Sequence, residues 1–227
     1  MKIEEEGLSI TAERRDGSII YTRDHNGERV EKVVFTTSDT ITISPVEPVN
    51  IPKEITPFLL VELERPMAIE PGAKGKCYLK FPIEFGVFVT KGKEHETLDI
   101  LTLTSSKFTL YGSVETGKIC KYWKSGISSK IPSVDMIREG VLRLDFINKT
   151  DQWIDVSKVV FNAYGMKIYY GSSFVSIVAE IQILSDLEAD ISFSNKAVKK
   201  GMKKALELYT LTKFQLIPLK FTMREGF

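Results

Sequence analysis

Apolar and polar side chains alternate along residues 141–147 (VLRLDFI). This two-residue period places the apolar groups on one face and the charges on the other, as in a half-buried antiparallel strand. Residues 148–152 form a polar connection of hairpin length. Residues 153–161 resume with β-branched side chains, and residues 166–170 add another apolar run. The pattern therefore predicts three consecutive strands in this part of the chain.

Comparable strand patterns recur through most of the sequence. The sequence His25-Asn26-Gly27-Glu28 predicts a tight hairpin turn between strands at 17–23 and 29–35, because Asn-Gly tolerates positive φ angles. No alternation of strands with helices supports a parallel sheet, so the predicted class is all-β, as a sandwich of antiparallel sheets. Further strands are predicted at 8–14, 40–44, 58–63, 77–89, 98–103, 108–111, 118–124, 174–184, 189–193 and 214–223.

The strand–turn–strand pattern of residues 58–89 resembles that of residues 141–170. Within it, FPIEFG at 81–86 matches FNAYG at 161–165 with one inserted residue. Two similar units predict two related β-sandwich halves, 1–115 and 116–227. One large sandwich domain is the alternative.

One segment near the C-terminus has the period of a helix. Between residues 195 and 210, Val198, Met202, Ala205 and Tyr209 recur at spacings of four, three and four. Lysines fill the other side, so the pattern predicts an amphipathic helix, which Gly201 would weaken by about 1 kcal/mol relative to alanine.

The overall charge is nearly balanced, but its distribution is not. A net charge of +1 gives the chain as a whole no attraction to nucleic acid or membranes. From residue 196 to the end, however, the sequence contains seven Lys and one Arg but only two Glu. This segment predicts a possible anionic partner (nucleic acid, lipid headgroups or an acidic protein), and a plain solvated surface is the alternative. The lysines that would carry the binding are Lys196, Lys199, Lys200, Lys203 and Lys204.

Location is predicted from what the chain lacks. No apolar run approaches the roughly 18 residues of a spanning helix, and the acidic start MKIEEEG lacks the core of a secretory signal. We therefore expect a cytoplasmic protein in which Cys77 and Cys120 are buried, reduced thiols.

Motifs for metal, nucleotide or nucleophilic chemistry are missing. His25 and His95 have no further ligand at metal-binding spacing, and neither glycine-rich phosphate loop nor nucleophile elbow occurs. We expect no metal and no cofactor.

The segment Cys120-Lys121-Tyr122-Trp123-Lys124-Ser125 is the best candidate for a ligand site. In a strand, Cys120, Tyr122 and Lys124 share one side, and a lysine beside a thiol lowers the thiol pKa. The alternative is structural, with Cys120 and the aromatic rings in the core and the lysines solvated. Trp123, beside the irregular residues 125–139, could still line a pocket. The predicted ligand-binding residues are Cys120, Tyr122, Trp123, Lys124 and Ser125.

Several short segments, taken in order from Pro45 to Tyr170, resemble an archaeal family known as domain of unknown function 432. The resemblance implies a soluble archaeal protein and transfers no catalytic residue. The segments are Pro45-Val46-Glu47-Pro48, Ile51-Pro52, Phe81-Pro82-Ile83-Glu84, Tyr111-Gly112, the Cys120 to Ser125 segment, and Phe161-Asn162-Ala163-Tyr164-Gly165-Met166-Lys167-Ile168-Tyr169-Tyr170.

Together these patterns predict a non-enzymatic cytoplasmic β-sandwich module for interaction or ligand binding. Binding of an anionic partner through the basic segment is one alternative, and an enzyme with its site near residues 120–125 is another. Exposed strand edges also make a homo-oligomer possible.

Overall fold

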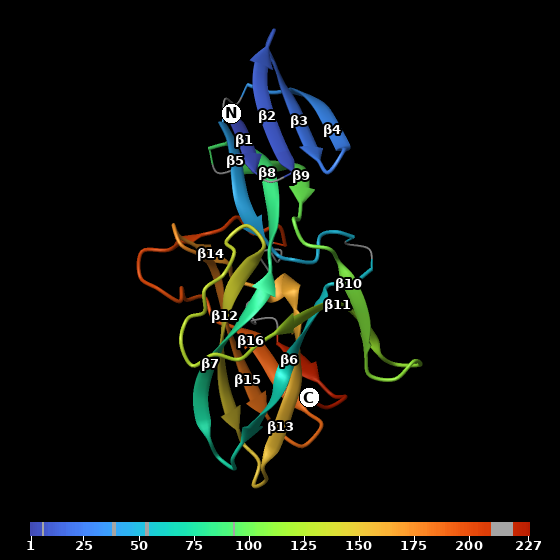
Figure 1. Ribbon diagram of the computed structural model, residues 1–227, viewed down its shortest axis with the longest axis vertical. Coiled ribbons are helices and arrows are strands. Elements are labelled where there is room, and N and C mark those ends of the chain that lie inside the picture. Colours follow the sequence, from blue (N-terminus) through green and yellow to red (C-terminus); the bar gives the residue numbers. More distant parts are fainter. Residues whose placement is uncertain (6, 38–39, 53–54, 93, 210–219) are drawn as a thin grey trace. The chain divides into compact units, whose positions relative to one another are not determined.

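A computed structural model describes residues 1–5, 7–37, 40–52, 55–92, 94–209 and 220–227 (Figure 1). Regular structure in these residues is strands and one 3-10 turn, η1 (Ala163–Gly165), which confirms the all-β class. Within the same residues no helix is long and apolar enough to cross a membrane.

Contacts divide the chain into two compact units. Unit 1 comprises residues 1–44 and 86–100, and unit 2 comprises residues 45–85 and 101–227. These bounds differ from the halves 1–115 and 116–227 that the sequence suggests. Whether the chain folds as two domains stays a prediction.

Unit 1 contains a four-stranded antiparallel sheet in chain order, β1-β2-β3-β4. The predicted Asn-Gly hairpin is confirmed: Asn26 and Gly27 have φ angles of 51° and 84°, and His25 pairs with Glu28. A second sheet has the order β5-β8-β9, and most of its residues belong to unit 1, although residues 45–46, 84–85 and 101 of its strands belong to unit 2. The strands are β1 (Lys2–Glu5), β2 (Leu8–Arg15), β3 (Ser18–His25), β4 (Glu28–Phe35), β5 (Thr40–Val46), β8 (Glu84–Lys91) and β9 (Glu94–Leu101).

A buried ion pair joins the two sheets of unit 1. The Arg23 Nε donates to the Asp99 carboxylate at 2.7 Å, and the Tyr21 hydroxyl donates to the same oxygen at 2.8 Å. Both donors come from β3 and the acceptor from β9, so one carboxylate fixes the two strands together.

Unit 2 is a sandwich of two larger sheets. The first has the order β10-β11-β6-β13, and the second has the order β17-β14-β15-β12-β7, with β16 and β18 added beside β15. Most pairs are antiparallel, but β11–β6 and β12–β15 are parallel. The strands are β6 (Phe58–Ile69), β7 (Lys74–Pro82), β10 (Lys107–Tyr111), β11 (Lys118–Ser125), β12 (Glu139–Asn148), β13 (Ile154–Asn162), β14 (Tyr169–Tyr170), β15 (Val175–Ile183), β16 (Ala189–Phe193), β17 (Lys203–Lys204) and β18 (Phe221–Met223).

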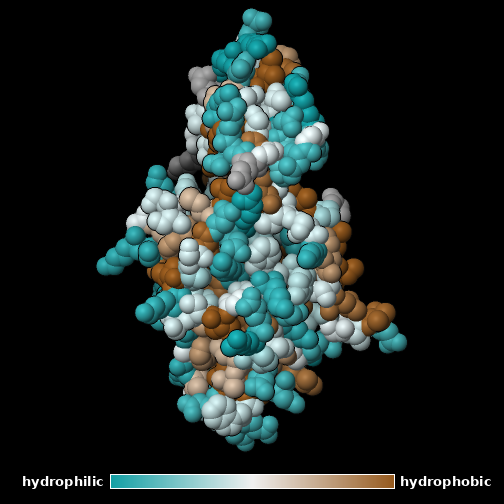
Figure 2. Space-filling model, viewed as in Figure 1, coloured by the Kyte–Doolittle hydropathy of each residue, from teal (hydrophilic) through white to brown (hydrophobic). Residues whose placement is uncertain are grey.

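The core of unit 2 lies between its two sheets. Leu59 and Phe161 come from the first sheet, Leu79 and Leu142 from the second, and all four are at most 1% exposed within one apolar cluster. The surface over the β10–β11 pair is less polar than its neighbours (Figure 2), because Leu110 and others on these strands stay exposed.

The polar connection at 148–152 crosses between sheets. β12 pairs with β7 and β15, whereas β13 pairs with β6, so the two strands are not hydrogen-bonded to each other. The Asn148 side chain, 1% exposed, donates to the backbone oxygens of Ile69, Glu70 and Gln152. Asn148 therefore ties this crossing to the end of β6.

The prediction of a helix near 195–210 is wrong for residues 195–209. Residue 210 lies outside the described residues. Gly201 has a φ angle of +85°, which a right-handed helix does not accept. Lys203 and Lys204 instead form β17, paired with Tyr170 and Tyr169. Pairing with β14 thus gives these two residues backbone partners on another strand in place of partners within a helix. Of the strand predicted at 214–223, residues 214–219 also lie outside the described residues, and β18 covers the end.

Candidate functional site

Three of the five predicted ligand-binding residues line a cavity of about 380 Å³. Tyr122, Trp123 and Lys124 are consecutive residues of β11. Arg138, from the irregular residues before β12, also lines the cavity. We call this cavity the Trp123 pocket. Its lining residues are Leu103, Thr104, Ser105, Lys107, Tyr122, Trp123, Lys124 and Arg138.

Cys120 and Ser125 lie in the interior, away from that cavity. Burial raises the pKa of Cys120 to about 12, although the nearby Lys118 charge opposes the shift. The thiol is therefore protonated at neutral pH and is a poor nucleophile. The Ser125 hydroxyl is 2% exposed, accepts from the Lys80 backbone N–H at 2.8 Å and donates to the Gly126 carbonyl at 2.8 Å.

Lys121 contradicts the expectation that the lysines of this segment are solvated. Its side chain is 2% exposed, and its Nζ donates to the Glu84 carboxylate at 2.6 Å. The second Glu84 oxygen accepts from the backbone N–H of Asn50 at 2.9 Å. Burial outweighs these contacts and raises the pKa of Glu84. The pair is part of the interior of unit 2.

The five lysines predicted to bind an anionic partner are all exposed. Lys199 and Lys200 border a small cavity of about 180 Å³, and the Lys199 Nζ lies 5.1 Å from the centroid of the Phe174 ring. Lys204 is paired with Glu207 at 2.6 Å. The lysines thus surround a turn and a short strand, and they do not form one helical face.

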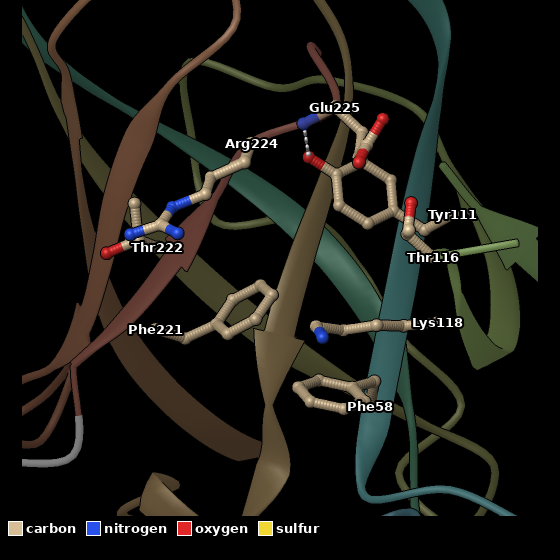
Figure 3. Close-up of a pocket in the computed structure, with 8 residues that line it drawn as sticks. All are labelled: Phe58, Tyr111, Thr116, Lys118, Phe221, Thr222, Arg224 and Glu225. Carbon is tan, nitrogen blue, oxygen red and sulfur yellow. Dashed lines mark hydrogen bonds between the residues drawn. The ribbon is translucent and has the colours of Figure 1, made fainter. Parts of the chain in front are cut away.

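A second cavity, of about 530 Å³, lies between β18 and the sheet that contains β11 (Figure 3). We call it the Lys118 pocket. Phe58 comes from β6, Tyr111 from β10, Lys118 from β11, and Phe221 from β18. Its lining residues are Phe58, Tyr111, Thr116, Lys118, Phe221, Thr222, Arg224 and Glu225.

Strand register explains why these side chains converge. Lys118 is paired with Tyr111, and Phe58 precedes Leu59, which is paired with Lys121. Because side chains alternate along a strand, Lys118, Tyr111 and Phe58 point to the same face of the sheet. β18 passes over this face and adds its own ring.

Two aromatic rings and an ammonium group form the floor of the Lys118 pocket. The Phe58 and Phe221 centroids are 5.0 Å apart, and the Lys118 Nζ lies 5.4 Å from the Phe58 centroid. Figure 3 shows the Lys118 side chain extending between the two rings, while Arg224 runs along the opposite wall beside Thr222. A cation at this distance from a ring is attracted to the ring face.

Hydrogen bonds hold the rim of the Lys118 pocket. The Tyr111 hydroxyl accepts from the Glu225 backbone N–H at 3.0 Å and donates to the Gly226 carbonyl at 3.1 Å. Burial is the main cause that raises the pKa of Tyr111, and the Glu225 and Cys120 charges raise it further. The phenol therefore stays neutral. Tyr111 therefore anchors the C-terminal residues against β10.

The electrostatics of the Lys118 pocket favour an anion. Lys118 and Arg224 contribute two positive charges and Glu225 one negative charge. Among the residues that the structure describes, the one ion pair of Arg224 is a long, exposed contact with Glu188, at 3.7 Å, which is worth little in water. Lys118 is in contact with a ring and forms no ion pair within the described part of the chain.

Sequence reasoning missed the Lys118 pocket. Lys118 begins the aromatic strand that the sequence singled out, but Phe221 and Arg224 lie about a hundred residues later. Local periodicity cannot report such a long-range approach. Among the described residues no three His, Cys, Asp or Glu side chains gather closely enough to hold a metal ion.

One family model matches residues 1–224 of the chain, and its description is "Protein of unknown function (DUF432)". No curated protein and no solved structure matches the chain. The archaeal origin that the resemblance implied stays a prediction.

Proposed function

Because the chain belongs to the DUF432 family, whose description assigns no activity, we propose its function from the Lys118 pocket alone. The protein is a non-enzymatic β-sandwich module that binds a small ligand with a flat apolar ring and an acidic group. The observation that carries this proposal is the Lys118 ammonium, held over the Phe58 ring at 5.4 Å in a cavity of about 530 Å³.

Size and composition support a small-molecule ligand. Pockets for small ligands measure about 300–1,000 Å³ and combine apolar walls with a few placed polar groups. The Lys118 pocket is within this range, with two phenyl rings and two cations. A flat ring can pack beside Phe58 and Phe221 while its acidic group reaches Lys118 or Arg224.

Binding without turnover is supported by the chemistry of the lining. None of the lining residues is Cys, His or Ser. The Thr222 hydroxyl does donate to the Asp190 carboxylate at 2.8 Å. Although partial burial opposes it, hydrogen bonds from Lys220 and Thr222 hold the pKa of Asp190 below its ordinary value, so this carboxylate is a weak base.

Anilinonaphthalene sulfonate, a fluorescent aromatic anion, is a direct probe of this pocket. We expect saturable binding to the folded protein, weakened about 10-fold by Lys118→Glu, which equals roughly 1.4 kcal/mol. Phe221→Ala should also weaken binding, because it removes one face of the ring site. Lys130→Glu, which reverses an exposed charge in a loop elsewhere, is the matched control.

Folding of each variant is checked by circular dichroism, because the same dye binds partly unfolded chains. Equal affinity of the wild type, Lys118→Glu and Phe221→Ala would show that the dye binds elsewhere and would refute the proposal.

The basic C-terminal segment supports a second candidate function, binding of an anionic partner. The supporting observation is that Lys196, Lys199, Lys200, Lys203 and Lys204 are all exposed within nine residues. Replacement of these five lysines by Glu should abolish salt-dependent binding to RNA, DNA or acidic vesicles. Negligible binding by the wild type at low salt would end this candidate. The cytoplasmic location and a homo-oligomer stay predictions.

A further inference from the structure

Two turns of unit 2 meet at one end of β14 and border the cavity of about 180 Å³. One turn, residues 171–174, joins β14 to β15, and the other, residues 199–202, precedes β17. These eight residues are the whole lining of the cavity. We call it the Lys199 pocket.

Strand register explains why the two turns lie together. β14 is paired with β15 on one side and with β17 on the other. The residue after β14, Gly171, donates its backbone N–H to the Phe174 carbonyl at 3.1 Å. On the side of β17, a Cβ built on Gly171 would lie 3.6 Å from the Met202 Cγ. Gly171 is therefore the point at which both turns come together.

The Lys199 pocket has two cations and no carboxylate in its lining. Lys199 and Lys200 are exposed, and within the described part of the chain neither forms an ion pair. The Lys199 Nζ lies 5.1 Å from the centroid of the buried Phe174 ring, a contact that attracts the ammonium group without neutralising its charge. In the same segment Lys204 already has a partner, Glu207. The uncompensated charge of this segment thus includes both lysines of the pocket.

Neutral hydrogen-bond donors belong to the same lining. Ser172 and Ser173 are exposed, and among the residues that the structure describes neither hydroxyl has a hydrogen-bond partner. Their backbone N–H groups donate to no carbonyl of those residues either. An incoming acceptor therefore displaces water from these donors and breaks no hydrogen bond between described residues.

We propose that the Lys199 pocket binds a phosphate group with two negative charges, either free in solution or as the headgroup of a lipid. Two ammonium groups match its charge, and its remaining oxygens can accept from the serine donors. The cavity has room for roughly six water molecules at about 30 Å³ each, which suits a single phosphate group. This inference rests on the second candidate function, binding of an anionic partner by the basic segment, and gives that binding a place and a chemical class.

Nuclear magnetic resonance of the backbone amides locates binding in this pocket even when the affinity is low. Inorganic phosphate, added to the nitrogen-15-labelled full chain in about 0.15 M salt, should shift the amide signals of residues 171–173 and 201 saturably and with one affinity. The double substitution Lys199→Gln and Lys200→Gln should weaken this binding about 10-fold, because it removes both charged donors. Unchanged amide signals outside the two turns show that the variant is folded.

Lys196→Gln combined with Lys203→Gln is the matched control. It removes the same charge from the same segment, but neither residue lines the Lys199 pocket. Salt of about 0.15 M screens charges beyond about 8 Å, so the affinity for inorganic phosphate should change by less than about 2-fold.

Vesicles distinguish the two sources of the phosphate group. One preparation contains phosphatidylcholine and phosphatidic acid in equal parts, and in the other phosphatidylserine replaces phosphatidic acid. Preferential sedimentation with phosphatidic acid, lost in the Lys199 and Lys200 double variant, indicates a lipid headgroup. Saturable binding of inorganic phosphate without this preference indicates a free phosphate.

Two results would overturn the inference. One is the absence of saturable shifts in the two turns when inorganic phosphate is added. The other is an equal loss of affinity in the two double variants, which would indicate attraction to the basic segment as a whole. In either case, salt-dependent binding of RNA, DNA or acidic vesicles by the wild type would leave the second candidate function standing without this pocket.

Discussion

The buried pair of Lys121 and Glu84 makes the interior of unit 2 dependent on two single residues. Their side chains are 2% and 0% exposed, and the charged atoms lie 2.6 Å apart. Removing water from both charges is unfavourable, and their mutual attraction offsets this loss only while both are present. Each residue therefore protects the other from being an unpaired buried charge.

Lys121→Met should therefore destabilise the protein by about 3–5 kcal/mol, because it leaves the Glu84 carboxylate without its cation. The double substitution Lys121→Met and Glu84→Gln should recover most of this loss, because no buried charge remains. Urea unfolding followed by circular dichroism measures both. If the double variant is as unstable as the sum of its single substitutions, the pair is not coupled in the way we describe.

Glu47 makes stability fall with rising pH. The side chain is 2% exposed, its Oε2 has no hydrogen-bond partner, and burial raises its pKa from 4.5 to about 7. The Glu207 charge adds to this shift, while backbone N–H groups of Glu47, Leu208 and Tyr209 oppose it. Between pH 4.5 and 7 the folded state thus holds a proton that the unfolded chain has released.

In that pH window the free energy of unfolding should fall by up to about 1.4 kcal/mol per pH unit. Below pH 4.5 the stabilisation is complete, and above pH 7 it is lost. Glu47→Gln should flatten the dependence, since the amide does not titrate. Urea unfolding at pH 5 and at pH 7.5, for the wild type and this variant, measures the difference. If the free energy of unfolding of Glu47→Gln fell with pH as steeply as that of the wild type, another group would be responsible for the pH dependence.

At the scale of the elements, the pairing of β12 with β7 depends on a residue without a side chain. Gly140 lies opposite Phe81, whose ring is 1% exposed. A Cβ built on Gly140 would lie 2.3 Å from the Phe81 Cε1 and 3.0 Å from the Val175 carbonyl oxygen. The ring occupies the space that any other residue would fill.

Gly140→Ala should consequently cost about 1–3 kcal/mol, because either the ring or the strand must shift. Gly171→Ala is a suitable control, since the atom nearest to its added Cβ is the Met202 Cγ, at 3.6 Å. The control should be nearly neutral in thermal unfolding. Equal melting temperatures of the two variants would mean that β12 and β7 separate more easily than their register implies.

Elements with a local physical cause are the ones that the sequence predicts. The Asn26-Gly27 turn needs positive φ angles, and the alternation at 141–147 needs one buried face, so both follow from neighbouring residues alone. The crossing at 148–152 does not follow from neighbouring residues, because a connection of this length can form a hairpin or pass from one sheet to the other. The partners that decide the matter are Ile69, Glu70 and β6, roughly eighty residues earlier.

The candidate site residues show the same difference between local signals and long-range contacts. The sequence singles out Tyr122, Trp123 and Lys124 because a strand rich in aromatic residues and lysine is unusual in local composition, and their role in ligand binding stays a prediction. The burial of Lys121 was not predictable, because its partner Glu84 is on another strand. The predicted helix failed for a related reason: its period was present, but pairing with β14 and the positive φ of Gly201 prevailed.

For the whole molecule, the two contact-defined units raise the question of whether unit 2 folds alone. Every residue of its apolar core cluster lies within residues 45–85 and 101–227. The Thr102 hydroxyl donates to the Ile83 carbonyl at 3.2 Å, so the chain ends created by removing unit 1 lie close together. Because each extended residue spans about 3.3–3.6 Å, roughly four Gly and Ser residues can join residue 85 to residue 101.

We expect this shortened chain, residues 45–85 linked to 101–227, to unfold cooperatively in urea and to bind anilinonaphthalene sulfonate as the full chain does. The physical reason is that the residues of its apolar core cluster, both members of the Lys121–Glu84 pair and the lining residues of the Lys118 and Trp123 pockets all lie outside residues 1–44 and 86–100. A shortened chain without a cooperative transition would show that unit 2 depends on unit 1 for its stability. In that case the two compact units would form one folding domain.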